Sequence, residues 1–198
     1  MTATASIAIE FEQTLDEIVA LFFDARSGFL LNNTRIVKAQ EQVVAANPND
    51  PEVNTIDALD AGRRHYYGTG EPWAPGSRIQ HVSTQGAFKA RNAEDGTNSR
   101  VVGNLCTVAI YSMWEDEYRG AIAASMKLAS NHLLVPVFGD IRHFRNSIIH
   151  HRGIAKNEVE RCELLKWFKP GETIFINEVR FDQMIHEIAT YLGSLHAA

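Results

Sequence analysis

The sequence predicts a mainly α-helical bundle, on three observations. Long stretches carry apolar residues every three to four positions, which is typical of amphipathic helices. Only one short run, residues 173–176, is rich in β-branched and aromatic residues. The chain of 198 residues is 45% hydrophobic and 22% charged, so it is long and apolar enough to bury a sizeable core. We expect a single domain over residues 1–198.

The N-terminal region, residues 6–46, predicts a long helix. Its apolar positions recur at helical spacing: Ile7, Phe11, Leu15, Ile18, Leu21 and Phe22. Gly28 lies midway and leaves open one long helix or two collinear ones. Pro48 and Pro51 then end the pattern. The apolar stripe of this region faces the core or a dimer partner.

Residues 49–66 predict a shorter helix, and residues 62–100 a long irregular, glycine-rich loop or insertion. Five glycines and two prolines between positions 68 and 100 interrupt any regular pattern. A connection of this length without regular structure is uncommon in a domain, so it is either functional or mobile. The Gly68-Thr-Gly70 sequence lacks the third glycine of a dinucleotide-binding fingerprint.

The second half of the chain is again helical. Residues 100–130 predict the second strong helix, with a wide apolar face. Asn157 is a candidate N-cap for a helix over residues 158–167. Residues 173–176 predict a short strand or an extended arm. Residues 178–195 predict the closing helix.

Residues 137–153 form the most unusual of the predicted helices. Projected at about 100° per residue, one arc carries Phe138, Ile141, Phe144, Ile148 and Ile149. Arg145 projects into this apolar arc. It therefore needs an acidic partner, a phosphate or a subunit boundary, because an unpaired buried charge is very costly.

Charge is distributed unevenly along the chain. The formal net charge of −5 argues against a general, charge-driven nucleic-acid binder. Between Ile141 and Asn157, however, there are four cationic residues, three histidines and no acid. A local basic patch of this kind suits a small anionic target such as one phosphodiester. Alternatively, His151 and Arg152 only complement the dipole at the end of the helix.

The remaining composition excludes several classes of protein. Cys106 and Cys162 do not form a C-x-x-C pair, so we expect a reduced, cytoplasmic protein rather than a disulfide scaffold or a zinc site. We expect neither a signal peptide nor a membrane span, because residues 1–6 lack a charged start and the sequence holds no apolar run of about 18 residues. We expect neither a metal ion nor another cofactor.

The sequence Arg145-Asn146-x-x-x-His150 resembles the signature of the HEPN family, the higher-eukaryote and prokaryote nucleotide-binding domains. The resemblance covers about residues 100–195. Its flanks are Trp114-Glu115-Asp116 before the motif, and Gly153-Ile154-Ala155 and Lys166-Trp167-Phe168-Lys169-Pro170-Gly171 after it. The resemblance implies an all-α bundle, usually a homodimer in which the two motif helices meet across a two-fold axis. It also implies a metal-independent endoribonuclease, often a toxin with an antitoxin partner or a defence component, or a non-catalytic relative.

As a hypothesis, the RNA's own 2′-hydroxyl attacks the phosphate. His150 acts as general base or acid, and Arg145 holds the phosphate. Asn146 orients His150 or bonds the phosphate, and Arg142 contacts the backbone. His151 and Arg152 are further substrate-binding candidates, with His151 a fallback for the histidine role. These two residues lie in the basic segment described above.

Arg145 and His150 lie about 140° apart on the helix, which we interpret as poor geometry for joint action on one phosphate. Two antiparallel copies of residues 137–153 would supply them from different chains. A second possibility is a non-enzymatic dimeric module that binds a nucleotide, RNA or a partner protein. A third is a helical scaffold without a ligand, in which Arg145 pairs with Glu115 or Asp116 and His150 caps the helix.

Overall fold

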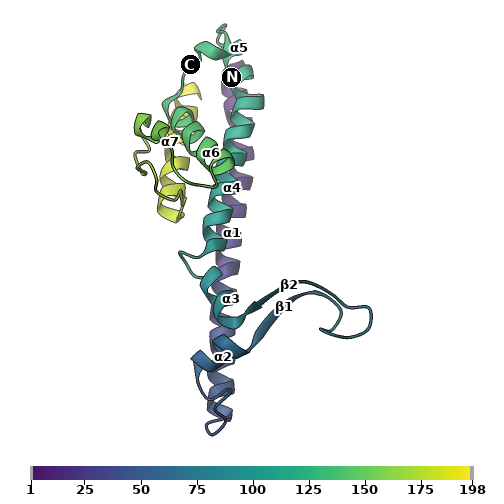
Figure 1. Cartoon of the computed structure of the whole chain (residues 1–198). Coiled ribbons are helices and arrows are strands. Elements are labelled where there is room, and N and C mark those ends of the chain that lie inside the picture. The colour runs from purple at the N-terminus through teal and green to yellow at the C-terminus, as the bar shows by residue number, and fades with distance from the viewer. Residues whose placement is uncertain (1, 197–198) are drawn as a thin grey trace. The chain divides into compact units, whose positions relative to one another are not determined.

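The computed structural model describes residues 2–196, and these residues are mostly helical, as the sequence predicts (Figure 1). The chain divides into two compact units. The motif unit comprises Met1–Asp24 and Arg100–Ala198, and the hairpin unit comprises Ala25–Ser99. None of the helices in the described part of the chain has the length and hydropathy that crossing a bilayer requires.

Helix α1 spans Ala3–Ala46 without interruption, and therefore belongs to both units. The predicted long N-terminal helix is confirmed. Of the two possibilities left open, the collinear pair is wrong, because α1 continues as one helix through Gly28. The helix ends just before Pro48, as the proline predicts.

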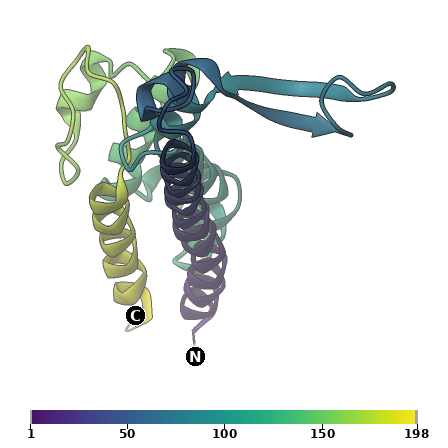
Figure 2. The ribbon, with the colours of Figure 1, turned by 90° about the horizontal axis from the view of Figure 1, so that it is seen from below.

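The motif unit holds the remaining long helices. They follow in the order α4 (Thr97–Met113), a π-helical turn η1 (Trp114–Tyr118), α5 (Arg119–Ser125), the 3₁₀ turn η2 (Ser130–His132), α6 (Pro136–His150), the 3₁₀ turn η3 (Asn157–Arg161) and α7 (Glu178–His196). The predicted helices over residues 100–130 and 178–195 are thus confirmed, the first with a π-helical turn in its middle. Figure 2 shows α7 running alongside the first part of α1.

Aromatic side chains hold the core of the motif unit together. Phe11 and Phe22 of α1 are separated by eleven residues, which is three helical turns, so they lie on one face. The Phe11 ring stacks on Tyr118 at 4.3 Å, and the Phe22 ring stacks on Phe181 of α7 at 3.9 Å. Phe11 and Phe22 are fully buried, so truncating either to alanine should cost about 3–5 kcal/mol.

The segment after α6 differs from its prediction. Residues 158–167 do not form a helix, since helical structure there is limited to the turn η3. The backbone N–H groups of residues 163–165 donate to the carboxylate of Asp140 instead of to carbonyls of their own segment, which is the physical reason. Of the predicted strand at residues 173–176, only a single bridge between Ile154 and Thr173 forms.

The hairpin unit corrects the prediction of an irregular segment at residues 62–100. After α2 (Ile56–Gly62), strand β1 (Arg64–Thr69) pairs antiparallel with β2 (Arg78–Thr84), and α3 (Gln85–Arg91) follows. The glycines and prolines gather mainly in the loop between the strands. Gly68 lies at a bulge, where a Cβ atom would collide with the carbonyl oxygen of Arg78. The breakers thus shape a hairpin rather than abolish regular structure.

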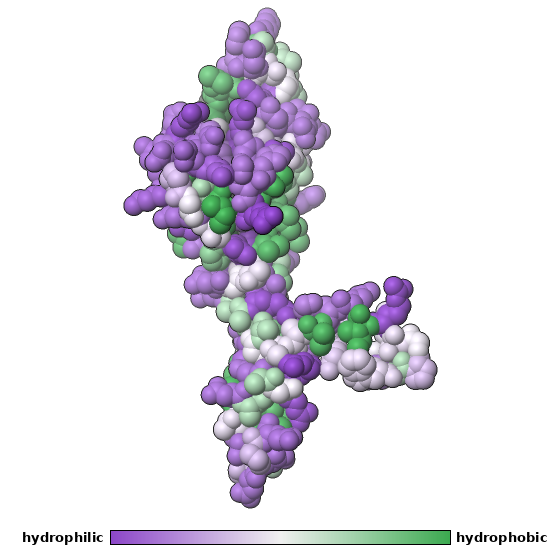
Figure 3. Space-filling model, in the orientation of Figure 1, coloured by the Kyte–Doolittle hydropathy of each residue, from purple (hydrophilic) through white to green (hydrophobic). Residues whose placement is uncertain are grey.

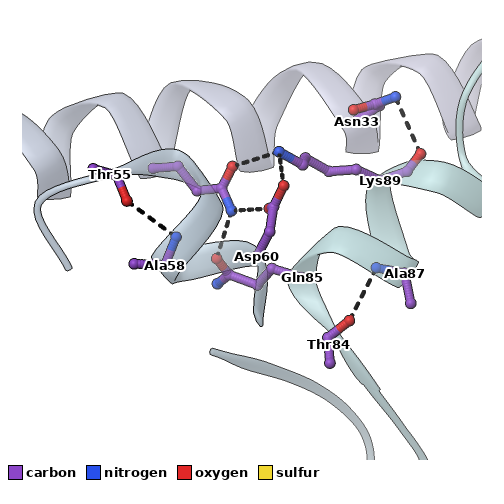
Figure 4. A network of polar contacts seen from close by, with 9 residues as sticks. Asn33, Thr55, Ala58, Asp60, Thr84, Gln85, Ala87 and Lys89 are labelled. Carbon is purple, nitrogen blue, oxygen red and sulfur yellow. Dashed lines mark hydrogen bonds and ion pairs between the residues drawn. The ribbon is translucent and has the colours of Figure 1, made fainter. Parts of the chain in front are cut away.

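A buried polar network joins α1, α2 and α3 within the hairpin unit (Figure 4). Gln40 of α1 is 2% exposed and donates from Nε2 to Asp60 Oδ1 at 2.7 Å and to Gln85 Oε1 at 2.9 Å. Lys89 of α3 donates to Gln40 Oε1 at 3.0 Å and pairs with the Asp60 carboxylate at 2.7 Å. Each donor and acceptor of the Gln40 amide therefore finds a partner, which offsets the cost of burying it.

Candidate functional site

Helix α6 carries the motif and has well-defined ends. Pro136 occupies the first helical positions, where its missing N–H costs nothing. The helix ends at His150, three residues earlier than the predicted 137–153. Arg152 and Gly153 both have left-handed backbone conformations, with φ of +56° and +76°. This turn redirects the chain immediately after the motif histidine and leaves that histidine exposed.

The buried face of α6 is narrower than predicted. Phe138, Ile141 and Phe144 are buried in the core, as their spacing indicates. Ile149 is 46% exposed, so its assignment to the core-facing arc was wrong. In the last turn, Ile148, which belongs to the same predicted arc, does pack against the core. Arg145 therefore lies half-buried at the border between core and surface.

Three motif side chains meet at this border, and we call them the α6 cluster: Arg145, Asn146 and His150. Arg145 Nη1 donates to Asn146 Oδ1 at 3.2 Å and lies 3.3 Å from His150 Nε2. Arg145 and His150 thus meet within one chain, whereas their poor placement for joint action on one phosphate stays a prediction. The long arginine side chain spans the angle that separates the two positions on the helix.

The contact between Arg145 and His150 is a hydrogen bond when the imidazole nitrogen accepts, because a guanidinium can only donate. Arg145 Nε is buried and has no hydrogen-bond partner within residues 2–196. The guanidinium thus retains a donor that nothing in the described chain satisfies, at a free-energy cost typical of functional sites.

No carboxylate among the described residues pairs with Arg145. Glu115, one of the two predicted partners, binds Arg119 instead, with its two oxygens 3.0 and 2.9 Å from Arg119 Nη1. Asp116, the other predicted partner, forms no ion pair with Arg145 either. The condition that would have favoured a scaffold without a ligand is therefore not met.

The other predicted site residues surround the cluster without joining it. His151 caps the end of α6, and Arg152 follows it in the left-handed turn; both are exposed. Arg142 is exposed on α6 and lines a cleft of about 260 Å³, which we call the α6 cleft. The structure thus brings Arg145, Asn146 and His150 together and places the remaining three beside them.

The α6 cleft was not predicted from the sequence. Trp114 and Phe138, stacked 3.9 Å apart, are among its lining residues, and Arg142, His143 and Arg161 line it as well. These residues come from η1, α6 and η3, three separate segments of the motif unit. Acids such as Glu115 and Glu163 line the cleft too, so no run of like charge marks it in the sequence.

Charges around the cleft act on His143. Burial lowers the pKa of His143, the Asp140 carboxylate opposes this, and the positive charges of Arg142 and Arg161 lower the pKa further. His143 is therefore held in its neutral form at neutral pH. The side chain of His143 is half-buried.

Two buried groups near α6 have structural roles. Asp140 is 2% exposed and accepts three backbone N–H groups, so its lone pairs are occupied. Burial raises the pKa of Cys162 to about 12, and the charge of Asp140 and a hydrogen bond to it contribute. Burial also raises the pKa of Cys106. Neither thiol is therefore suited to act as a nucleophile at neutral pH.

Within residues 2–196, no three His, Cys, Asp or Glu side chains gather in an arrangement that could hold a metal ion. No family model, curated protein or solved structure matches the chain.

Proposed function

We propose that this chain is a HEPN-type, metal-independent endoribonuclease that cleaves RNA by attack of the 2′-hydroxyl on the adjacent phosphate. The observation that carries the proposal is the 3.3 Å contact between Arg145 Nη1 and His150 Nε2 at the exposed end of α6. A phosphodiester is the natural target for an arginine that has no acidic partner among the described residues.

The reaction needs one proton acceptor and one group that stabilises negative charge. His150 Nε2 takes the proton of the 2′-hydroxyl as that oxygen bonds to phosphorus. The bond from phosphorus to the 5′-oxygen breaks, and water protonates the leaving oxygen. The products are a 2′,3′-cyclic phosphate and a 5′-hydroxyl. Arg145 binds the non-bridging oxygens, on which negative charge grows in the transition state.

Binding of the phosphate also prepares the base. When Arg145 turns its Nη1 toward a phosphate oxygen, it releases His150 Nε2, whose lone pair is then free to accept the proton. Asn146 holds Arg145 from the adjacent position and so limits how far the guanidinium can move. Arg142, His151 and Arg152 are exposed near the cluster and contact neighbouring phosphates.

The test is incubation of the purified protein with mixed RNA in EDTA, followed by detection of 2′,3′-cyclic phosphate ends. We expect cleavage by the parent and a loss of about 10²–10⁴-fold in His150→Ala, the usual contribution of a general base. Arg145→Lys keeps the charge but loses the planar donor fork, so it should also cleave more slowly.

A matched control is His186→Ala, which removes an exposed histidine on α7 and should leave cleavage unchanged. His151→Ala separates the two adjacent histidines. If His151→Ala lost activity while His150→Ala kept it, the assignment of the base would be wrong. Equal cleavage by the parent and by both His150→Ala and Arg145→Lys would contradict the proposed site.

The second candidate is a non-catalytic HEPN-like module that binds a nucleotide, RNA or a partner protein such as an antitoxin. The net charge of −5 favours it, because it disfavours broad activity on RNA. In both cases we propose a homodimer through residues 137–153 in the cytoplasm. The exposed Ile149 at the end of α6 then lies in the interface. Binding without turnover would support this module over the nuclease.

A further inference from the structure

The β1–β2 hairpin of the hairpin unit exposes aromatic and apolar side chains on both of its faces. The register pairs Tyr66 with Val82 and Tyr67 with His81, so these two pairs lie on opposite faces. Tyr67 is 46% exposed and Val82 is 50% exposed. Figure 3 shows hydrophobic side chains uncovered on the hairpin beside hydrophilic ones. A two-stranded sheet has no core of its own to justify such residues.

The loop between the strands exposes a tryptophan whose backbone conformation is strained. Trp73 is 78% exposed and has a φ of +70°, a left-handed conformation that is strained for a bulky side chain. Its ring meets Tyr66 edge-on, with the centroids 5.9 Å apart. Strain that brings little burial to the fold indicates a side chain kept for an external contact.

The hairpin is also positively charged, although the chain as a whole is acidic. Residues 63–84 hold three arginines and one glutamate, which gives a net charge of +2. Since the whole chain has a net charge of −5, the other residues together carry −7. Arg64 and Arg78 are exposed on the strands. At the base of the hairpin, Arg91 Nη2 is buried and has no hydrogen-bond partner within residues 2–196. This charge pattern favours a polyanionic partner.

We propose that residues 63–84 form an arm that binds single-stranded nucleic acid. Bases stack on Trp73 and Tyr67, while Arg64 and Arg78 contact the phosphates between them. A second copy of the arm is a poor partner, because edge-to-edge pairing would bring two segments of +2 together. The exposed aromatic faces favour unstacked bases over a closed duplex. The inference goes beyond the cleavage proposed for α6 and does not depend on it.

The test is the anisotropy of a labelled oligonucleotide of about 12 nucleotides, a length within the range that single-strand-binding domains cover. It is made as RNA, as DNA of the same sequence and as a DNA duplex, and is used with the His150→Ala protein. The two single strands should bind with similar affinity and the duplex more weakly. Without a 2′-hydroxyl, the DNA also resists the proposed cleavage, so binding is measured separately from chemistry.

Two variants of the arm should weaken binding in different ways. Trp73→Ala removes one stacking platform and should raise the Kd about tenfold. The double variant Arg64→Gln, Arg78→Gln should also raise the Kd. It should lower the slope of log Kd against log salt concentration by about 1.4, which is about 0.7 for each lost phosphate contact. The matched controls are Leu134→Ala, 80% exposed in the motif unit, and Arg35→Gln, exposed on α1.

Circular dichroism checks that each variant folds. Quenching of tryptophan fluorescence by the oligonucleotide should be largely lost in Trp73→Ala, because Trp114 is buried and Trp167 is partly buried. Unchanged affinity in both arm variants would overturn the proposal. The proposal would also be overturned if the arm variants changed the oligomeric state of the protein but not its affinity for the oligonucleotide, because the partner of the arm would then be a protein. Loss of RNA cleavage in His150→Ala with normal binding leaves the arm supported.

Discussion

Asp140 should contribute more to stability than any exposed acid of the motif unit. Its carboxylate is 2% exposed and accepts the N–H groups of Glu163, Leu164 and Leu165 at 2.8, 2.8 and 2.7 Å. Replacing Asp140 by alanine removes all three bonds at once. The segment that follows η3 then has no substitute acceptor, because its own carbonyls do not form a helix.

The expected loss follows from what each N–H can do afterwards. A hydrogen bond to a charged group contributes about 1.5–3 kcal/mol. Glu163 and Leu164 are exposed, so water can replace part of their bonds, whereas Leu165 is fully buried and its N–H stays unsatisfied. We therefore expect Asp140→Ala to lower the free energy of unfolding by about 3–5 kcal/mol. Asp140→Asn keeps one oxygen and should lose less.

Urea unfolding monitored by circular dichroism measures this loss, provided that the slope of the transition is unchanged. The control is Asp182→Ala, an exposed acid on α7, which should change stability by less than about 0.5 kcal/mol. A second readout is the thiol of Cys162, whose pKa of about 12 partly reflects Asp140. Removing the carboxylate should make Cys162 easier to alkylate. A loss below about 1 kcal/mol in Asp140→Ala would refute the reasoning.

Two further predictions test the packing and the polar network. Gly103→Ala should destabilise the protein by about 2–3 kcal/mol in urea unfolding, because the added Cβ collides with the carbonyl oxygen of Ile176. Gly120→Ala, where nothing lies within 4 Å of the new Cβ, should be neutral or stabilising. Burial alone would raise the pKa of Asp60. Hydrogen bonds from Lys89 and from the Gln40 amide, together with the charge of Lys89, outweigh burial, so the pKa of Asp60 is lowered. Because its pKa is lower in the folded state, the Asp60 carboxylate stabilises the fold at pH values above its unfolded pKa of about 3.8. The stability deficit of Asp60→Asn should therefore be constant near neutral pH and should vanish as the pH falls below 3.8. A deficit that persists in acid would contradict this.

The helices could be predicted because the spacing of their apolar residues follows the face that each helix buries in the core. Phe11 and Phe22 recur at helical spacing in α1, and both are fully buried. A helix that buries one face leaves this pattern whatever its partners are. The sequence for the same reason predicts α1 and α7 within a few residues of their ends.

The region after α6 could not be predicted, because its conformation depends on a distant side chain. Asn157 and the residues after it carry the local signals of a helix, yet Asp140 binds the N–H groups of residues 163–165. The hairpin was missed for a different reason. From the sequence alone, its glycines and prolines indicate only that no helix forms. In the structure, Gly68 and the loop that follows it allow β1 and β2 to pair.

The candidate site was predicted by residue but not by geometry. The spacing of Arg145, Asn146 and His150 identified the residues, and they do meet. A helical projection gives the direction of each Cβ and ignores the length of the side chain, so it did not indicate that Arg145 reaches His150. The α6 cleft involves three separate segments and left no local signal.

The net charge of −5 averages over segments of opposite sign. Residues 141–157 carry +4 and residues 63–84 carry +2, so the rest of the chain carries −11. At physiological salt, charges further apart than about 8 Å are largely screened from one another. A phosphate bound at either basic segment is therefore attracted by its neighbours and only weakly repelled by the acidic remainder. An overall acidic chain can thus bind RNA at selected segments and still avoid indiscriminate binding, which is what a selective nuclease requires.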